Sequence, residues 1–381
     1  MNKVDIAAHG EYISITLDDA HYRFHAIWLR DNAQDESTRN KTNGQRLIGL
    51  HDIASNIVIS QVKLNADSVS ISFMPEKITL DYPFDWLIKH SYDHPKAKPG
   101  PWLEPPQTLW DAALMGHIPE ANFDDVCASP LALQAWLEDI SKFGFAKLNN
   151  GPVKAFALTQ VVDLFGYIRE TNYGRIFEVQ VEEKPTNLAF TGLKLQAHTD
   201  NPYRDPVPSV QVLYCLESSA AGGENILVDG FMAATLLYQE NPHGFNLLCR
   251  YCARFEYAGE DDVILQSRRP LIELAGDGQL QGIRFNNRSA APFTDIPFEH
   301  MADYYAAYRR LSEIINDNRL EVSFRLNPGD CFVIDNTRVL HAREAFSGSG
   351  TRWLQGCYAD IDGLKSRLKV LQKSTSKTPK D

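Results

Sequence analysis

Short runs of alternating apolar and polar residues dominate the first part of the chain. Between residues 11 and 90 these runs are YISITL (12–17), YRFHAIWL (22–29), NIVISQVKL (56–64) and SVSISFM (68–74), with turn residues between them. Successive side chains of a strand point to opposite faces, so a period of two indicates half-buried strands. Residues 1–93 are therefore predicted to form a small antiparallel β domain.

A proline-rich segment interrupts this pattern. HPKAKPGPWLEPPQ, residues 94–107, carries five prolines. Proline lacks a backbone N–H and fixes its own φ angle, so the segment suits neither a helix nor a central strand. We predict an extended linker and a domain boundary near residue 100.

The longer second part combines one strongly helical stretch with many strand-like pieces. SPLALQAWLEDISKFG (129–144) begins with serine and proline, which is typical of a helix N-terminus, and ends at a glycine. The predicted strands are FAKLNN (145–150), NLAFTG (187–192), SVQVLYCLES (209–218), ENILVDG (224–230), GIRFNN (282–287), DCFVIDN (330–336) and RWLQGCYADI (352–361). A single helical insert, FEHMADYYAAYRRLSEIINDN (298–318), is predicted between the early and the late strands. Many short strands are typical of a barrel or sandwich, which we expect over residues 108–370, with a flexible tail at 371–381.

Composition narrows the class of protein only loosely. Of the 381 residues, 44% are hydrophobic and 23% are charged, which is ordinary for a soluble globular chain. The net charge of −11 and the scattered basic residues argue against sequence-independent binding of nucleic acid. The sequence shows neither an apolar run of roughly 20 residues nor a signal-peptide core, so we expect a cytoplasmic protein with no membrane partner. Cys249 and Cys252 form a C-x-x-C without a second pair, which favours core packing over zinc or redox chemistry.

The segment LQAHTDNPYRDP (195–206) carries the first candidate chemistry. His198 and Asp200 occupy positions i and i+2, which share one face of a strand, so both side chains can reach one ion. An H-x-D pair by itself is more often an ordinary polar strand end. His341, at the far end of NPGDCFVIDNTRVLH (327–341), is the candidate third ligand. Two histidines and one carboxylate on one face suit Fe(II) in oxygen-activating enzymes, whereas zinc prefers a tetrahedral site.

An arginine eleven residues after His341 adds to this pattern. Arg352 follows the turn SGSG, and its planar guanidinium can pair with a carboxylate brought to the metal. Together, H-T-D, the distal histidine and this arginine resemble the Fe(II)/2-oxoglutarate dioxygenases of the taurine dioxygenase superfamily. Within that superfamily, HAIWLRDN (25–32), YGRIFEVQ (173–180), TNLAFTG (186–192) and HTDNPYRDPVPSVQVLYCLE (198–217) resemble the γ-butyrobetaine hydroxylases.

The resemblance implies a fold and a set of cofactors. It implies a double-stranded β-helix, or jelly roll, after the N-terminal β domain, and it implies a homodimer. The implied iron ligands and catalytic centre are His198, Asp200 and His341, with 2-oxoglutarate as co-substrate and O2 as oxidant. Arg352 is implied to bind the distal carboxylate of 2-oxoglutarate. Asn225, in GGENILVDGF (222–231), stands where many members carry a threonine that donates to the same carboxylate.

The resemblance also implies a substrate with a quaternary ammonium group. In the family a box of aromatic rings attracts this cation through the negative ring faces. The matching positions of this chain are Tyr173, Phe177, Phe190 and Tyr358. The polar candidates for the anionic end of the substrate are Asn187, Asn201, Asn286, Asn287 and Arg288. Taken singly, each of these rings is more often part of an apolar core, and an arginine is as often a surface charge.

The N-terminal domain departs from related animal enzymes, which hold a structural zinc through three cysteines and a histidine. The matching positions of this chain are Ala33, Asp35, Thr38 and approximately Ile78. We therefore expect no zinc in this domain, and we expect apolar packing around Trp28, Leu29 and Trp86 to hold it together.

Several substrates and one non-enzymatic function stay open. The leading hypothesis is hydroxylation of γ-butyrobetaine to carnitine, or of a close trimethylammonium acid. 2-(Trimethylammonio)ethylphosphonate keeps the cation and replaces the carboxylate with a phosphonate, which an arginine such as Arg288 would suit. Trimethyllysine would need an acidic partner for its α-amino group, which the sequence does not identify. A non-catalytic betaine-binding protein would keep the aromatic box but would have no use for the metal ligands or for Arg352.

Overall fold

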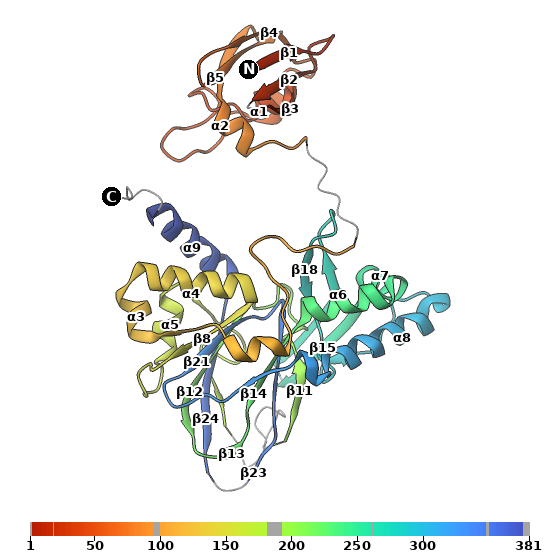
Figure 1. The fold of residues 1–381 in the computed structure, drawn as a ribbon. Helices are drawn as coiled ribbons and strands as arrows, with labels where there is room; N and C mark the ends of the chain where they lie inside the picture. The colour runs from red at the N-terminus through yellow and green to blue at the C-terminus, as the bar shows by residue number, and fades with distance from the viewer. Residues whose placement is uncertain are drawn as a thin grey trace. The chain divides into compact units, whose positions relative to one another are not determined.

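Two compact units make up the chain, Met1–Ala97 and Lys98–Asp381. The computed structural model describes residues 2–17, 19–93, 100–180, 193–260, 262–347 and 350–375 (Figure 1). No helix within these ranges is long and apolar enough to cross a membrane. The boundary between the units falls within the proline-rich segment 94–107.

The first unit is built from two antiparallel sheets of three strands, ordered β1-β2-β3 and β4-β5-β6. Its elements are β1 (Lys3–Ile6), β2 (Tyr12–Leu17), β3 (Ala20–His25), α1 (Ala26–Asp31), η1 (Leu50–Asp52), β4 (Val58–Leu64), β5 (Ser68–Met74), β6 (Ile78–Pro83) and α2 (Phe84–Lys89). The alternation expected from the sequence is present, because β2 buries Ile13 and Ile15 and β5 buries Ile71 and Phe73. These side chains meet in one apolar core.

One predicted strand of this unit is wrong in its second half. The sequence predicts a strand over residues 22–29, but β3 ends at His25 and α1 begins at Ala26. Ala26, Leu29 and Arg30 are buried at the i, i+3 and i+4 spacing of a helix face. A helix of two turns is too short for that period to stand out from a period of two.

Polar side chains connect α1 with distant parts of the first unit. Arg30 Nε donates to Glu76 Oε2 over 2.6 Å, and Arg30 Nη1 donates to Thr38 Oγ1 over 2.9 Å. Thr38 is one of the positions that match zinc ligands in related enzymes, and here it is buried and hydrogen-bonded. Trp28 and Trp86 pack against the apolar core with their ring centroids 5.4 Å apart.

Two sheets face each other in the second unit and form the double-stranded β-helix that the resemblance implies. The major sheet has the order β10-β24-β12-β21-β8-β7, with β9 beside β24, and the minor sheet has the order β11-β22-β14-β20. The major-sheet strands are β7 (Glu120–Asn122), β8 (Phe145–Asn149), β9 (Ile168–Arg169), β10 (Phe177–Val179), β12 (Val210–Ser218), β21 (Cys331–Asp335) and β24 (Arg352–Ala359). The minor-sheet strands are β11 (Leu195–His198), β14 (Asn225–Asp229), β20 (Val322–Phe324) and β22 (Val339–Arg343).

Smaller sheets and helices complete the second unit. The remaining strands are β13 (Ala221–Gly222), β15 (Cys252–Glu260), β16 (Val263–Pro270), β17 (Ile272–Leu274), β18 (Leu280–Ile283), β19 (Ala290–Ala291) and β23 (Phe346–Ser347). The helices are η2 (Ala112–His117), α3 (Phe123–Ala128), α4 (Pro130–Phe143), α5 (Leu158–Asp163), α6 (Gly230–Glu240), α7 (Pro242–Arg250), α8 (Phe298–Ile315), η4 (Asn318–Leu320) and α9 (Ile361–Thr375).

Strand alternation divides the sheet residues between two environments. On β12, Val210 and Val212 pack in an apolar cluster beneath helices, whereas Leu213 and Cys215 join a cluster between the two sheets. Neighbouring strands follow the same rule, because cross-strand partners point to the same face. The inner face of each sheet is therefore where side chains from both sheets can meet.

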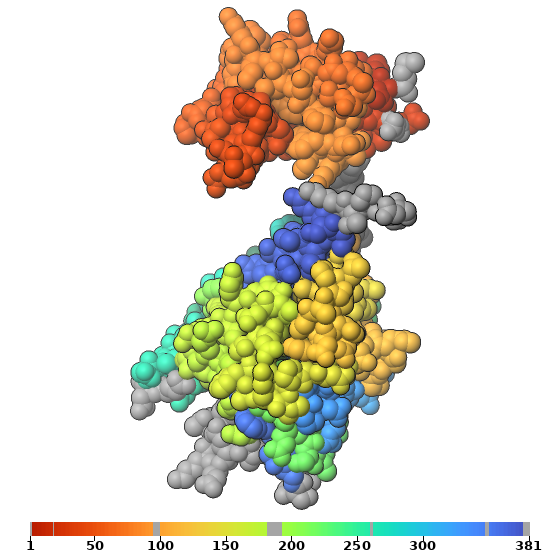
Figure 2. All heavy atoms as spheres, turned by 90° about the vertical axis from the view of Figure 1, so that its left-hand side faces the viewer, coloured from red at the N-terminus to blue at the C-terminus, as the bar shows by residue number. Residues whose placement is uncertain are grey.

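Helices cover the outer face of each sheet (Figure 1). The major sheet is covered by α3, α4, α5 and α9, and the minor sheet by α6, α7 and α8. In Figure 2, α4 and α5 form a continuous yellow to yellow-green surface, with α9 in blue beside α4. Cys249 of the C-x-x-C packs against the core beneath α6 to α8.

The helix predicted over residues 129–144 is confirmed as α4. Ser129 caps it by accepting a hydrogen bond from the Ala132 N–H over 3.3 Å, and Pro130 occupies the first turn. Gly144 ends it with a φ of 77°, in the left-handed region that favours glycine.

The predicted insert at 298–318 is confirmed as α8, but it is not the single helix expected between the early and the late strands, because α6 and α7 were missed. The apolar residues of α6 surround that helix and hide its period. The amphipathic pattern of α7, with Asn241 as its cap and Pro242 in its first turn, was a usable signal.

Both ends of the second unit extend further than expected. Trp102, within the predicted linker, pairs with Gln279, and its Nε1 donates to the Asp277 carbonyl oxygen over 3.0 Å. At the other end, α9 continues to Thr375, so residues 371–375 are helical rather than part of a flexible tail. Leu371 anchors this last turn because its side chain is buried.

A buried ion pair connects several of these layers. Asp229, at the end of β14, accepts from Arg338 Nε over 3.0 Å and from Arg338 Nη2 over 2.9 Å. The two side chains are 0% and 1% exposed. Arg338 also donates to the carbonyl oxygens of Lys142 and Thr108, and Asp229 caps α6 at Phe231. One guanidinium therefore joins the minor sheet, α4 and the chain that enters the unit.

Asp229→Asn should destabilise the second unit by about 3–5 kcal/mol, because it leaves the Arg338 charge buried without its counter-ion. Urea unfolding followed by the reaction of Cys215, Cys331 and Cys357 with a thiol reagent reports this unit alone, since all three cysteines are buried in it. Glu240→Gln is the matched control, because Glu240 also receives two Arg310 hydrogen bonds but is exposed. Equal midpoints for the two variants would contradict the importance of the buried pair.

Candidate functional site

Antiparallel pairing of β11 with β22 brings the two predicted histidines together. His198, the last residue of β11, lies opposite His341 in the ladder, and their ring centroids are 4.3 Å apart. His341 also pairs with Leu227 of β14 on its other side. Main-chain pairing, rather than a loop, therefore sets the separation of the two imidazoles.

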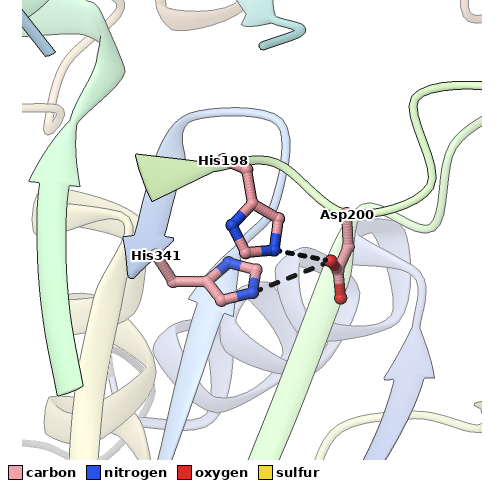
Figure 3. A group of neighbouring side chains, drawn as sticks. All are labelled: His198, Asp200 and His341. Atoms are coloured by element: carbon pink, nitrogen blue, oxygen red, sulfur yellow. Dashed lines mark ion pairs between the residues drawn. The ribbon is translucent and has the colours of Figure 1, made fainter. Parts of the chain in front are cut away.

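Asp200 completes the group two residues after His198 (Figure 3). Its Oδ1 lies 3.3 Å from Nε2 of His198 and 3.7 Å from Nε2 of His341. One ligand atom from each residue lies within 4.8 Å of the others. Thr199, between the two, turns away, and its hydroxyl accepts a hydrogen bond from the Phe285 N–H over 3.1 Å. The predicted placement of positions 198 and 200 toward one ion is confirmed.

Charge and burial fit these side chains to a divalent cation. Burial raises the pKa of Asp200, but the neighbouring imidazoles of His341 and His198 outweigh this effect and lower the pKa below its usual range. Burial lowers the pKa of His341 to about 3, so its imidazole is neutral at neutral pH. His198 Nδ1 lies 2.8 Å from the Gln196 carbonyl oxygen, and when it donates there Nε2 keeps the lone pair. Two imidazoles and one carboxylate are the donor set that Fe(II) takes in oxygen-activating enzymes.

The second oxygen of Asp200 is held by the major sheet. Gln211 Nε2 donates to Oδ2 over 2.6 Å, and the Tyr358 hydroxyl donates to it over 2.8 Å. Gln211 and Tyr358 are cross-strand partners on β12 and β24. Asn336 fixes the backbone, because its Oδ1 accepts from the Asp200 N–H and its Nδ2 donates to the Asp200 carbonyl oxygen.

A cavity of about 600 Å³ adjoins the three candidate ligands. Its wall includes Leu213 of β12, Phe332 of β21 and Leu354 of β24, which come from the inner face of the major sheet. The opposite wall includes Leu195 and Ala342 of the minor sheet. A mainly apolar cavity of this size, with a few converging polar groups, is typical of a small-molecule site.

Aromatic rings line one part of this cavity. Among them are the predicted Tyr173, Phe177 and Tyr358, joined by Tyr203 and Tyr257. The ring centroids of Tyr203 and Tyr257 are 5.1 Å apart, and those of Phe177 and Tyr358 are also 5.1 Å apart. The hydroxyl oxygens of Tyr173 and Tyr203 are 2.7 Å apart, and burial raises the pKa of Tyr203 to about 12. Tyr203 therefore stays neutral at neutral pH.

Phe177 owes its position to a glycine on the neighbouring strand. It lies opposite Gly356 in the pairing of β10 with β24. A Cβ added at Gly356 would overlap the Phe177 ring. The close approach of this ring to β24 therefore requires glycine.

Polar residues from two loops reach the cavity on another side. The predicted Asn201, Asn286 and Arg288 all line it. Asn201 has a φ of 51°, which asparagine tolerates, and its Oδ1 accepts from the Tyr203 hydroxyl over 2.7 Å. Its buried Nδ2 has no hydrogen-bond partner among the described residues. Arg288 keeps an exposed surface, and the protein packed around its guanidinium lowers its pKa.

Arg352 and Asn225 form a second polar group at the cavity wall. Arg352 Nη2 donates to Asn225 Oδ1 over 3.0 Å, and both side chains are buried. Arg343, opposite Asn225 in the minor sheet, also lines the cavity. Burial, followed by the charge of Arg343, lowers the pKa of Arg352 to about 10, which leaves it cationic at neutral pH. Two buried guanidiniums that repel each other favour an anion at this place.

Three predicted site residues are not part of the described cavity. Asn187 and Phe190 lie outside the described residues. Asn287 is exposed, and its side chain bonds Tyr308 and Gln196 away from the cavity. Asn287 does not line the cavity because residues 287 and 288 form a turn, in which the Arg288 N–H donates to Asn286 Oδ1 over 3.0 Å and the Asn287 side chain meets Tyr308 instead.

Several residues that the fold brings to the cavity are not predicted from the sequence. They are Tyr203, Gln211, Glu256, Tyr257 and Arg343. Tyr203 lies within the quoted HTDNPYRDP segment and Arg343 lies two residues after His341, so strand spacing was a usable signal for Arg343. Glu256 and Tyr257 come from β15, whose place beside the site depends on long-range packing and leaves no local signal.

Comparison with known proteins assigns the chain to a family. The family model described as taurine catabolism dioxygenase TauD, TfdA family matches residues 104–358. The chain belongs to this family. The γ-butyrobetaine dioxygenase of Pseudomonas sp. (strain AK-1) is 31% identical over 369 residues, which cover 96% of this chain and 95% of the relative.

Other relatives of this TauD/TfdA protein bear other names. The mitochondrial trimethyllysine dioxygenase of Rattus norvegicus is 29% identical over 369 residues, which cover 95% of this chain and 86% of the relative. Among solved structures, asparagine oxygenase aligns with a TM-score of 0.49 and 17% sequence identity, over 63% of this chain and 82% of that chain.

This TauD/TfdA dioxygenase is an Fe(II)- and 2-oxoglutarate-dependent enzyme in which His198, Asp200 and His341 form the ligand set. The donor chemistry of the site fits iron, because one carboxylate and two imidazoles have ligand atoms within 4.8 Å of one another. A non-catalytic betaine-binding protein, the alternative from the sequence, does not account for this set. The family assignment and the geometry both contradict that alternative.

His341→Ala should lower the affinity for Fe(II) more than about 100-fold, because even loss of a hydrogen-bond partner behind a ligand typically costs about 10–100-fold. Iron retained after anaerobic loading and desalting measures the effect. His243→Ala is the matched control, since His243 is exposed and pairs only weakly with Asp303 at 3.6 Å. Equal iron retention by both variants would contradict the ligand role of His341.

Proposed function

We propose that this enzyme hydroxylates a small trimethylammonium zwitterion, γ-butyrobetaine (giving carnitine) or a close analogue. The observation that carries the proposal is the group of aromatic rings that continues from the metal ligands into the same cavity. The names of the relatives support it, because γ-butyrobetaine dioxygenases and trimethyllysine dioxygenases both act on trimethylammonium compounds.

The aromatic rings suit a cation that cannot donate a hydrogen bond. Tyr173 and Tyr203 bond each other through their hydroxyls, and Tyr358 donates its hydroxyl to Asp200. A trimethylammonium group needs none of these hydroxyls, since it is attracted by the negative ring faces. The substrate cation is therefore proposed to lie among Tyr173, Phe177, Tyr203, Tyr257 and Tyr358, with Phe190 as a further candidate from the sequence.

The two buried arginines support binding of the co-substrate. Arg352 is proposed to pair with the distal carboxylate of 2-oxoglutarate, as the resemblance implies. The oxygen of Asn225 accepts from Arg352, which leaves its NH2 group to donate to the same carboxylate. Asn225 thus fills the role of the threonine found in many family members. Arg343 adds positive charge at this end of the cavity.

The anionic end of the substrate is proposed to meet Asn201, Asn286 and Arg288, with Asn187 as a further candidate. The unpaired Nδ2 of Asn201 is a donor in need of an acceptor. A guanidinium can bind a carboxylate or a phosphonate, and a dianionic phosphonate gains more from it. Arg288 therefore favours 2-(trimethylammonio)ethylphosphonate as a second candidate substrate.

A third compound belongs in the same assay. Trimethyllysine needs an acid for its α-amino group, and Glu256 provides one at the cavity. The Glu256 carboxylate already accepts from Gln266 Nε2 over 2.5 Å, and it is exposed. We keep it as the weaker alternative because no second acid among the described cavity residues, apart from the metal ligand Asp200, would share the ammonium charge.

In the proposed reaction the main task of the protein is to position the substrate rather than to transfer protons. Bound Fe(II) supplies the chemistry in which O2 oxidises 2-oxoglutarate to succinate and CO2, while one oxygen atom enters a substrate C–H bond to give an alcohol. The protein's own residues hold the cation among the rings, hold the anion at Arg288 and keep one carbon near the metal ligands. The homodimer implied by the resemblance stays a prediction.

Anaerobically loaded enzyme should form succinate after O2 is admitted, and the correct substrate should strongly stimulate this. The assay compares γ-butyrobetaine, 2-(trimethylammonio)ethylphosphonate and trimethyllysine at equal concentration, with mass spectrometry for the added oxygen. Stimulation by one compound together with its hydroxylated product identifies the substrate. Stimulation by none of the three, while iron and 2-oxoglutarate still bind, would contradict the proposed substrate class.

Arg288→Gln should weaken the apparent affinity for the zwitterionic substrate, seen as a rise in its KM, by roughly 10–100-fold, because a hydrogen bond to a charged group is worth about 1.5–3 kcal/mol. The apparent affinity for the co-substrate should change little. Phe177→Ala is the companion variant, because it weakens the cation end and leaves the guanidinium in place. If Arg288→Gln instead weakened only the binding of the co-substrate, Arg288 would belong to the co-substrate site.

A further inference from the structure

Tyr358 takes part in two sites at once. Its ring borders the cavity beside Phe177, and its hydroxyl donates to Asp200 Oδ2 over 2.8 Å. Tyr358 is 5% exposed, and its hydroxyl points from the cavity wall toward the carboxylate of Asp200. Of the cavity tyrosines, Tyr173 and Tyr203 bond each other instead, and Tyr203 donates to Asn201.

The two oxygens of Asp200 face different sheets. Oδ1 lies toward the two histidines of the minor sheet (Figure 3), while Oδ2 is held by Gln211 and Tyr358 of the major sheet. Hydrogen bonds to Oδ2 occupy that oxygen and leave Oδ1 as the metal ligand. A small rotation of this carboxylate therefore changes the metal site and the Tyr358 hydroxyl together.

We propose that Tyr358 is a positioning residue that links substrate binding in the aromatic part of the cavity to metal binding at Asp200. A metal ion on Oδ1 fixes the carboxylate, and the carboxylate fixes the Tyr358 ring in the orientation that the cation needs. A cation against that ring holds the hydroxyl on Oδ2 in turn. Such a link is reciprocal, so each ligand tightens the binding of the other by the same factor.

Gln211 allows the positioning of Asp200 to be distinguished from the link between metal binding and substrate binding. It donates to the same oxygen over 2.6 Å, it is 2% exposed, and its own Oε1 has no hydrogen-bond partner among the described residues. Gln211 carries no ring against which a trimethylammonium group can pack. It should therefore strengthen metal binding without transmitting the presence of substrate.

The test measures two equilibria rather than turnover, with Mn(II) as a redox-stable metal. The affinity for Mn(II) is read from the electron paramagnetic resonance of the free ion, with and without γ-butyrobetaine or its phosphonate analogue, at constant 2-oxoglutarate. The affinity for the trimethylammonium compound is measured with and without Mn(II). In the wild-type protein each ligand should tighten the other about fivefold or more, within the usual range of coupling between sites.

Three variants distinguish the link from a general structural effect. Tyr358→Phe keeps the ring and removes the hydroxyl, so the compound should still bind while the linkage factor falls to near one. Tyr173→Phe, the matched control, removes a hydroxyl from the same cavity that bonds Tyr203, and it should keep the wild-type factor. Gln211→Met should weaken Mn(II) equally with and without the compound. Melting temperatures near that of the wild type confirm that each variant is folded.

The outcomes separate this inference from the proposed function on which it rests. A wild-type protein that binds no trimethylammonium compound would contradict the proposed function itself. A wild-type protein that binds one equally well with and without Mn(II) would overturn the linkage and leave the function standing. If Tyr358→Phe kept the wild-type linkage factor, the hydroxyl of Tyr358 would not couple the two binding sites. The same conclusion would follow if Tyr173→Phe lowered the linkage factor as much as Tyr358→Phe does.

Discussion

The carboxylate of Asp200 is the point at which the two sheets of the catalytic unit meet. One oxygen faces the imidazoles that β11 and β22 bring together, and the other accepts hydrogen bonds from β12 and β24. A buried carboxylate is stable only when both oxygens have partners, so the sheets must keep their separation for the charge to remain satisfied. The helices outside each sheet and the Arg338–Asp229 pair hold the frame within which this balance exists.

The residues that line the cavity come from parts of the chain that are far apart in sequence, and each part contributes different chemical groups. The minor sheet supplies both histidines, which hold the metal, and Arg343, which adds positive charge. The major sheet supplies Tyr358 and Arg352, and β15 adds Tyr257 to the aromatic wall. Arg352 is the first residue of β24, and Tyr358 lies near its other end. Distance along one strand, rather than a choice of sheet, separates this guanidinium from this ring.

Local periodicity was enough to predict the parts of this site that lie on strands. His198, Asp200 and His341 follow from the period of two and from one distal motif, and α4 follows from its serine cap and its terminal glycine. The same rule would have placed Arg343 inward, whereas Asn287 lies in a turn that strand alternation does not describe. Tyr257 and Glu256 could not be found in this way, because β15 reaches the cavity through long-range packing that leaves no local pattern in the sequence. The start of α1 at Ala26 was missed because six residues show too little of a helical period.

Gly356 gives the aromatic wall a property that the metal site lacks. Gly356 is neither adjacent in sequence to the iron ligands nor paired with them across strands. Its missing side chain nevertheless leaves the space that the Phe177 ring fills. The place of one ring in the cavity wall is therefore set by a residue that carries no side chain at all. A single exchange there, to any residue with a side chain, would move this ring without replacing a metal ligand. Because Tyr358 contacts the same ring and also bonds Asp200, the displacement would press on the metal site as well.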